Sequence, residues 1–170
     1  MSCSLEKLNS CDRAAFVAVL GHLFEHSPWV AEEAWAARPF RDAPSLHAAL
    51  CTAMRAAPRD RQLALIRAHP DLAGRLARQR QLTAESTREQ AGAGLDRLTE
   101  AELAEFTALN ELYQARFGFP FIICARLNAK AAILAAMQAR VESSSDAEFA
   151  IALGEIEKIA WLRLQDVLAN

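Results

Sequence analysis

The chain has 170 residues, which is enough for one compact domain with a sizeable hydrophobic core. Its composition, 52% hydrophobic and 24% charged, is that of a folded globular protein and excludes the disordered class. The 19 basic and 21 acidic side chains give a formal net charge of −2, so no basic field is available to attract nucleic acid. No apolar run of the sequence is long enough to span a bilayer.

Four scattered cysteines show neither a C-x-x-C pair nor the spacing of a metal site: Cys3, Cys11, Cys51 and Cys124. We expect them to be reduced and mostly buried. The first residues lack the basic-then-apolar order of a secretory signal, and the last residues carry no peroxisomal tripeptide. These features predict a cytoplasmic protein.

Helix-forming residues such as Ala, Leu, Glu and Arg dominate the chain, and no alternating strand pattern of useful length occurs. In the first half, caps and prolines predict four helices. The first is capped by Asn9 or Ser10 and carries apolar residues as far as Phe24, and the second runs from Pro28 through Trp35 with Ser27 as its N-cap. The third runs from Pro44 to about Ala57, and the fourth from Arg59 to Ala68.

The second half shows three further helix signals. Thr99-x-x-Glu102 is a capping box for a long amphipathic helix that ends at Gly118, Asn128 is placed to cap an Ala-rich helix, and Ser145-x-x-Glu148 is a second capping box for the last helix. We therefore predict an all-α fold, a single compact helical bundle domain of roughly seven to nine helices over residues 1–170.

The segment 69–74 is the first that departs from a plain bundle pattern. Pro70 disfavours the α region for the residue before it, so we expect His69 to be extended at a helix start. The backbone then orients the imidazole beside free N–H groups of the helix terminus, which makes His69 a candidate catalytic residue. The alternative is an exposed loop histidine.

Two further segments are candidates for binding. If residues 82–92 are helical, Ser86, Glu89 and Gln90 share one face, where a hydroxyl, a carboxylate and an amide suit a small polar ligand. For this segment alone, a solvated helix surface is the stronger interpretation. In residues 116–126, Gly and Pro break the chain among aromatic residues, and buried main-chain groups there must find partners. A hydrophobic core turn explains this composition equally well.

A rival motif lies at His22-Leu23-Phe24-Glu25-His26, which fits the H-x-x-E-H pattern of zinc peptidases. Two histidines at i and i+4 share a helix face and could hold a metal. This hypothesis is weak because the expected helix around the motif is core-forming and no third ligand follows. We expect His47 to be an ordinary histidine on a helix surface.

The three segments together resemble one family, the decarboxylases of 2-oxo-4-hydroxy-4-carboxy-5-ureidoimidazoline (OHCU). The motifs stand in the family's order: His-Pro-Asp-Leu-Ala-Gly at 69–74, Leu-Thr-Ala-Glu-Ser-x-x-Glu-Gln at 82–90, and Phe-Gly-Phe-Pro-Phe at 117–121. Shorter matches extend the similarity over nearly the whole chain: Arg38-Pro39-Phe40, Ala93-Gly94-Leu95, Asn110-x-x-Tyr113, and the tail over residues 153–164.

The resemblance implies an all-α protein, usually a homodimer, that converts OHCU, the unstable product of urate oxidation and hydrolysis, into (S)-allantoin. It implies His69 as the catalytic histidine, and we expect Glu89 to hydrogen-bond the substrate hydroxyl or to orient His69. The substrate-binding residues that it implies are Pro70, Ser86, Thr87, Arg88, Gln90, Phe121, Ile122, Ile123, Cys124, Ala125 and Arg163.

The substrate of this family contains its own electron sink, because the carbon that loses the carboxylate adjoins a C=N bond. We therefore expect neither a cofactor nor a metal; the protein has to supply orientation, charge stabilisation and a proton. A helix N-terminus disfavours the imidazolium form of His69 whereas a nearby Glu89 favours it, so both protonation states stay open. A helical interaction module without catalysis is the alternative to an enzyme.

Overall fold

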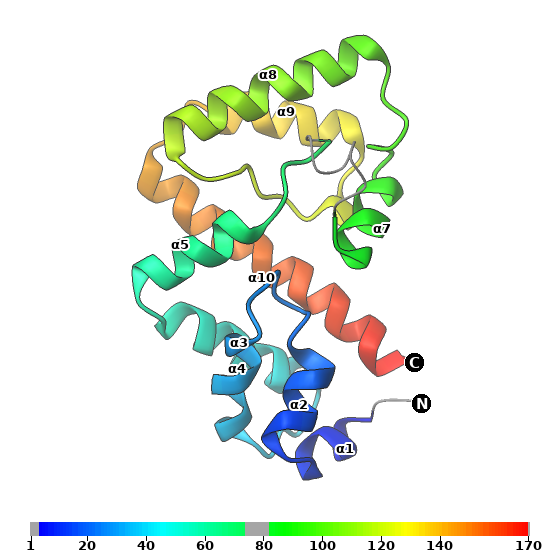
Figure 1. Ribbon diagram of the computed structural model, residues 1–170, viewed down its shortest axis with the longest axis vertical. Coiled ribbons are helices and arrows are strands. Elements are labelled where there is room, and N and C mark those ends of the chain that lie inside the picture. Colours follow the sequence, from blue (N-terminus) through cyan, green and yellow to red (C-terminus); the bar gives the residue numbers. More distant parts are fainter. Residues whose placement is uncertain (1–3, 74–81, 170) are drawn as a thin grey trace. The chain divides into compact units, whose positions relative to one another are not determined.

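The computed structural model describes residues 4–73 and 82–169, and within these ranges it contains nine α-helices, two short 3-10 helices and no strand (Figure 1). The all-α prediction is therefore confirmed. The chain divides into two compact units, Met1–Ala68 with Ile156–Asn170 and His69–Glu155. The single domain over residues 1–170 stays a prediction, and Cys3 and Gly74 lie outside the described residues.

The first unit is built from the N-terminal helices and the last part of the C-terminal helix. Its fully buried side chains include Phe16, Leu20, Leu46, Leu50 and Met54. The elements are α1 (Leu5–Ser10), α2 (Arg13–Leu20), α3 (Trp29–Ala34), η1 (Trp35–Ala37), α4 (Ala43–Ala56), α5 (Arg59–Ala68) and the end of α10 (Ser145–Ala169).

The predicted first helix is wrong in both its cap and its length. Asp12 is the N-cap of α2 and its side chain accepts a hydrogen bond from the N–H of Ala15, because Asn9 and Ser10 belong to a separate short helix. The helix ends at Leu20. Phe24 is buried, but it lies in the turn that follows the helix and not on a helix face.

The predicted N-cap Ser27 is also wrong, and α4 has an N-cap for which no prediction was made. Ser27 makes no side-chain cap, since α3 begins at Trp29 and Pro28 occupies its N-cap position. Asp42 caps α4, in a reciprocal capping box with Ser45. Gln62 of α5 donates to the carbonyls of Met54 and Arg55 and so satisfies groups left open at the end of α4.

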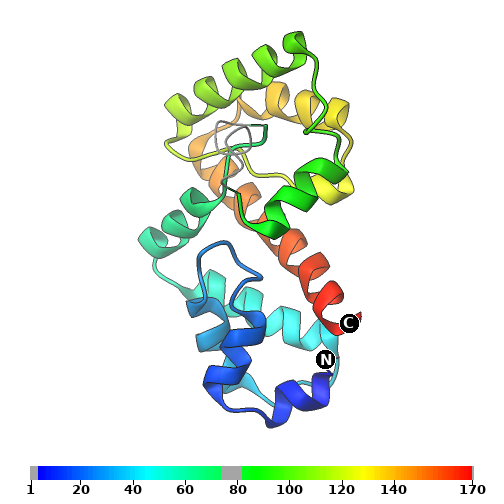
Figure 2. The same cartoon turned by 45° about the vertical axis from the view of Figure 1, so that its right-hand side comes forward.

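The second unit contains α7 (Ala84–Gly92), α8 (Glu100–Phe117), η2 (Ala125–Leu127), α9 (Lys130–Arg140) and the first part of α10. Helices α8 and α9 lie side by side in both views, and α7 contacts η2 (Figures 1 and 2). An aromatic cluster forms the core beneath α8: the ring of Tyr113 lies 4.5 Å from that of Phe117 and 5.4 Å from that of Phe121.

The predicted limits of α8 are confirmed. Thr99 and Glu102 form the capping box, and Gly118 closes the helix with a left-handed φ of 73°. The two later caps are wrong, because the side chain of Asn128 donates to the carbonyl of Cys124 and the carboxylate of Glu148 faces inward to an arginine. Glu148 therefore binds Arg140 and Tyr113 instead of capping its helix, and Asn128 binds back to a carbonyl four residues before it.

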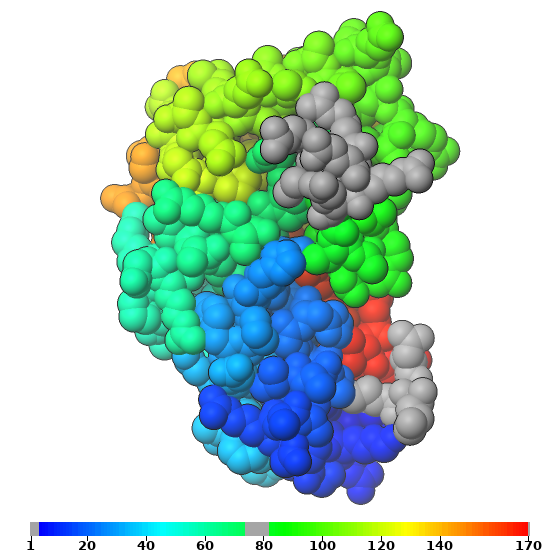
Figure 3. Space-filling view, viewed as in Figure 1, coloured from blue at the N-terminus to red at the C-terminus, as the bar shows by residue number. Residues whose placement is uncertain are grey.

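Helix α8 forms part of the surface of the second unit in the space-filling view (Figure 3). Leu112 of this helix is 52% exposed. No helix in the ranges 4–73 and 82–169 combines the length and the apolarity that crossing a membrane requires.

Candidate active site

The loop that follows His69 is held by two side-chain amides. Gln90 of α7 accepts a hydrogen bond from the N–H of Ala73 at 3.0 Å and donates to the carbonyl of Asp71 at 3.4 Å. Asn110 of α8 donates to the carbonyl of Leu72 at 2.9 Å. These bonds fix a backbone that a non-glycine residue seldom adopts, since Ala73 has a φ of 52°.

His69 is buried at the end of α5, directly before this loop, and Pro70 is half-buried. The interpretation of His69 as an exposed loop histidine is therefore wrong. Burial also raises the pKa of the neighbouring Asp71 carboxyl. The amide bonds to residues 71–73 consequently restrict the main chain that carries the imidazole.

Helix α7 separates its predicted site residues into two faces. Thr83 caps the helix by accepting the N–H of Ser86, and the side chains of Ser86 and Gln90 are buried, with Glu89 half-buried on the same face. A fully solvated α7 is therefore excluded. The side chains of Thr87 and Arg88 lie on the exposed face, so for these two residues contact with substrate stays a prediction.

Residues Phe121 to Ala125 are all buried; the first four form a non-helical segment after α8, and Ala125 is the first residue of η2. Their main chain is held by side chains of later helices: Arg140 donates to the carbonyl of Ile122 at 2.8 Å, and Glu155 accepts the N–H of Cys124 at 2.8 Å. This segment is thus anchored by charged groups, which a plain hydrophobic turn does not require.

The thiol of Cys124 links this segment electrostatically to α7. Burial raises its pKa, and the carboxylates of Glu155 and Glu89 raise it further. The charge of Glu89 is therefore close enough to act on Cys124, in agreement with the contact between α7 and η2. The second unit accordingly joins three predicted segments: the loop after His69, the inner face of α7, and residues 121–125.

Arg163 belongs to the first unit, where it forms a buried ion pair. Its Nη1 lies 3.1 Å from Oε2 of Glu25, and the two side chains are 4% and 2% exposed. The same nitrogen donates to the carbonyls of His22 and Leu23 at 3.4 Å. Sequence alone does not distinguish this arginine from a surface arginine, whereas the structure shows it buried beside a carboxylate.

This ion pair removes the basis of the zinc-peptidase hypothesis. Residues 22–26 lie in turns after the end of α2, so His22 and His26 do not share a helix face, and Glu25 pairs with Arg163. In the described ranges, no group of three or more His, Cys, Asp or Glu side chains is placed to hold a metal ion.

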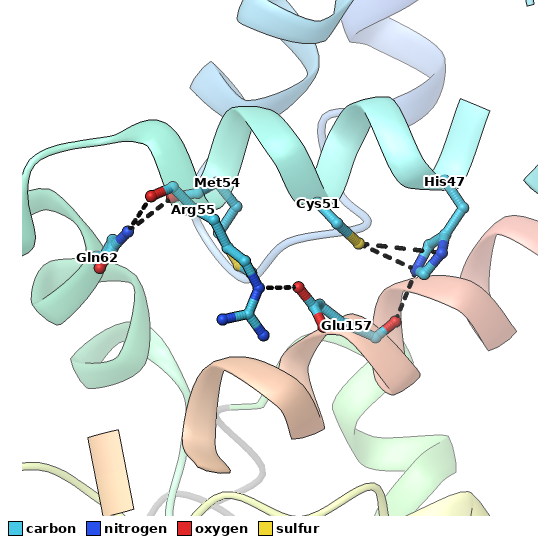
Figure 4. Close-up of polar contacts among 6 residues, drawn as sticks. All are labelled: His47, Cys51, Met54, Arg55, Gln62 and Glu157. Carbon is cyan, nitrogen blue, oxygen red and sulfur yellow. Dashed lines mark hydrogen bonds and ion pairs between the residues drawn. The ribbon is translucent and has the colours of Figure 1, made fainter. Parts of the chain in front are cut away.

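Cys51 and His47 lie side by side on α4, where a thiol next to an imidazole could form a nucleophile pair (Figure 4). Sγ of Cys51 lies 3.3 Å from Nε2 of His47, but that nitrogen is also 2.9 Å from the carbonyl oxygen of Glu157. Burial, assisted by the Glu157 carboxylate, raises the pKa of Cys51 to about 12. The thiol is therefore protonated at neutral pH, and His47 binds α10 instead of facing solvent as expected.

Three residues that anchor the site were not identified as functional from sequence: Asn110, Arg140 and Glu155. Asn110 carried a usable signal, because it is a polar residue in the apolar stripe of α8 and is buried. Arg140 and Glu155 resemble ordinary charged residues of helix surfaces, and only their tertiary contacts reveal the difference.

The sequence model of the family described as OHCU decarboxylase matches residues 9–165. The 2-oxo-4-hydroxy-4-carboxy-5-ureidoimidazoline decarboxylase of Haloferax volcanii is 44% identical over 163 residues, which are 96% of this chain and 95% of the relative. The mouse protein of the same name is 41% identical over 162 residues, 95% of this chain and 91% of the relative.

Two solved structures share the fold. A crystal structure of (S)-allantoin synthase has a TM-score of 0.77 at 32% identity and covers 98% of this chain and 54% of that chain. A crystal structure of OHCU decarboxylase in the presence of (S)-allantoin has a TM-score of 0.69 over 84% of this chain and 92% of that chain, and at 24% identity it shows the fold alone. By the family match and the identity to these relatives, the chain belongs to the OHCU decarboxylase family.

Proposed function

We propose that this chain is a carboxy-lyase that decarboxylates OHCU to (S)-allantoin in urate degradation. Membership of the family supports this function, as do relatives that are named as decarboxylases of OHCU in Haloferax volcanii and in mouse. The structural neighbour named (S)-allantoin synthase supports the product and its configuration. The homodimer and the cytoplasmic location stay predictions from the sequence.

The observation that carries the proposal is the convergence of three sequence motifs within one unit. The amide of Gln90, which follows Glu89 on α7, binds the main chain just after His69, and α7 contacts η2 at the end of residues 121–125. A histidine, a carboxylate and an anchored main-chain segment thus belong to one local arrangement. Such a combination suits a small substrate that is rich in hydrogen-bonding groups.

The substrate can lose carbon dioxide without an added electron sink. The bond between the ring carbon and its carboxylate breaks, and the released electron pair moves toward the adjoining C=N bond, which gives a ring with a C=C bond and a protonated nitrogen. A proton then adds to the carbon that carries the ureido group, and the hydroxyl becomes the carbonyl of allantoin. The face on which this proton arrives sets the configuration of the product.

In this scheme His69 is the acid/base that handles the proton. Glu89 hydrogen-bonds the substrate hydroxyl or orients the imidazole. His69 is buried and Glu89 is half-buried, which supports these roles because charges and dipoles act more strongly away from water. The main chain of residues 121–125 is proposed to bind the ring and ureido groups, with Pro70, Ser86 and Gln90 completing the site. Contact of Arg163 with the substrate stays a prediction from the sequence.

The test is a stereochemical assay with His69→Ala. Freshly generated OHCU decays slowly to racemic allantoin, so optical activity followed by CD reports the catalysed reaction. We expect the wild-type chain to give an optically active product and His69→Ala to lose about 10²–10⁴-fold in turnover, the usual contribution of a positioned proton donor or acceptor. The far-UV CD spectrum should be unchanged.

One of the two exposed histidines of the first unit, His22, provides the matched control. Its replacement by alanine should leave turnover within about twofold of wild type, since its imidazole is not among the proposed site groups. A wild-type chain that leaves the racemic decay unaltered would refute the function. Near-normal turnover by a folded His69→Ala variant would refute the role of His69 alone.

A further inference from the structure

We propose that Arg140 is a positioning residue for the substrate-binding segment Phe121–Ala125, and that Glu148 and Tyr113 hold Arg140 for this task. The proposal rests on the proposed function, which assigns substrate contact to that segment. None of these three side chains is among the predicted site residues, although Tyr113 belongs to the short family match Asn110-x-x-Tyr113. Arg140 comes from α9, Glu148 from α10 and Tyr113 from α8.

The segment needs external support because its first four residues, 121–124, have no regular secondary structure. It lies between the left-handed cap of α8 at Gly118 and η2, and its residues are buried. Buried main-chain groups outside helices and sheets require partners from elsewhere in the protein. Arg140 supplies one by donating from Nη1 to the carbonyl of Ile122 at 2.8 Å.

Arg140 contacts two consecutive residues of the segment. Besides its hydrogen bond to Ile122, the guanidinium lies over the ring of Phe121, with 4.3 Å between Cζ and the ring centroid. A cation over an aromatic face is attracted to it, and the planar guanidinium can stack where an ammonium cannot. The position of the main chain and the orientation of the ring are therefore set by the same side chain.

The guanidinium is itself fixed by a buried carboxylate. Nη2 of Arg140 lies 2.8 Å from Oε2 of Glu148, and Nε lies 3.0 Å from the same oxygen. The Glu148 side chain is fully buried and that of Arg140 is 14% exposed. The hydroxyl of Tyr113 donates a hydrogen bond to the carboxylate of Glu148. Burial raises the pKa of Tyr113, so the hydroxyl keeps its proton and stays a hydrogen-bond donor.

This arrangement differs from the usual role of an arginine at the end of a helix. Such a residue ordinarily stabilises the last carbonyls of its own helix. Arg116, at the end of α8, is the comparison in this chain. It also binds outside its own helix, since its guanidinium, which lies 5.6 Å from the ring of Phe117, donates to the carbonyls of Glu142 and Ser143, but it is exposed. Arg140 instead directs its fork to a buried carboxylate and to the candidate site.

The experiment compares Arg140→Lys with Arg116→Lys in the full chain. Lysine keeps the positive charge but cannot bind Glu148, Ile122 and Phe121 at once. We expect Arg140→Lys to lower kcat by about tenfold to a hundredfold, the range that a displacement of about 1 Å produces in a positioned site, and to lower the enantiomeric excess of allantoin. Arg116→Lys should keep kcat and enantiomeric excess within about twofold of wild type.

A second variant guards against simple loss of folding. Replacing both buried charges, in Arg140→Met with Glu148→Met, removes the ion pair without leaving one charge unpaired, and such replacements are often neutral for stability. We expect this double variant to unfold at a denaturant concentration close to that of wild type and yet to show the same loss of kcat. Wild-type kcat and enantiomeric excess in folded Arg140 variants would overturn the proposal.

Amide hydrogen exchange separates this proposal from the proposed function. The amides of residues 121–125 should exchange faster in Arg140→Lys than in wild type or in Arg116→Lys, whether or not the chain decarboxylates OHCU. If the wild-type chain does not decarboxylate OHCU, the proposed function is refuted. The exchange rates of residues 121–125 still decide whether Arg140 anchors this segment. Unchanged exchange in Arg140→Lys would overturn the anchoring.

Discussion

The buried ion pair between Arg163 and Glu25 gives the sharpest stability prediction for this chain. Replacing Glu25 by glutamine keeps the size of the side chain and an acceptor oxygen but removes the negative charge. The two side chains are only 4% and 2% exposed, so water cannot replace the lost carboxylate without a change in structure. The guanidinium of Arg163 then keeps its charge in a buried position.

Breaking a buried pair by removing one partner costs about 3–5 kcal/mol. The carbonyls of His22 and Leu23 still accept hydrogen bonds from Arg163, which places the expected loss near the lower limit, about 3 kcal/mol. For a chain of this length, each kcal/mol lowers the melting temperature by about 2–4 °C. Glu25→Gln should therefore lower the melting temperature by about 6–12 °C.

The measurement is urea unfolding followed by far-UV CD, with Glu33→Gln as the matched control. Glu33 pairs with Arg61 in the same unit, but these side chains are 41% and 42% exposed, so the same chemical change should cost at most about 1 kcal/mol. The slope of unfolding free energy against urea should not change in either variant. Equal and small losses in Glu25→Gln and Glu33→Gln would contradict the argument from burial.

Two further predictions concern single groups. Asn110→Leu leaves the carbonyl of Leu72 without its amide donor, so it should lower the free energy of unfolding by about 1–3 kcal/mol and reduce turnover. Urea unfolding measures the first effect and the stereochemical assay the second. Unaltered values for both would exclude a role of Asn110 in holding the loop. The alkylation rate of Cys51 in the native protein, followed by peptide mass spectrometry, should rise about tenfold per pH unit from pH 8 to 11 because its pKa is about 12, and a plateau near pH 9 would contradict that pKa.

Local signals predicted those features that depend on neighbouring residues. Helix α5 has the predicted limits Arg59–Ala68, and Gly118 ends α8 in a left-handed conformation that residues with a side chain avoid. Thr99 and Glu102 cap α8 because their partners lie three residues apart in the same turn. A hydrogen bond of this kind needs no information about the rest of the fold.

Predictions of N-caps failed where the side chain bound another group instead of the start of its own helix. The carboxylate of Glu148 binds Arg140 and Tyr113 instead of capping α10, and the cap position is taken by Ser144, whose hydroxyl accepts the N–H of Ala147. The side chain of Asn128 likewise binds the carbonyl of Cys124 and leaves α9 without a side-chain cap. A buried carboxylate gains more from a guanidinium than from an exposed main-chain N–H.

Composition and short-range patterns were enough to predict the helical class, most helix limits and the motifs of the family, because each of these depends on residues that are close together in the chain. The tertiary structure alone decided that Gln90 and Asn110 hold the loop after His69, that Arg140 and Glu155 hold residues 121–125, and that Glu25 pairs with Arg163. These contacts join residues from 17 to 138 positions apart. Whether a polar side chain is buried beside a partner depends on the packing of distant helices, and no local pattern records it.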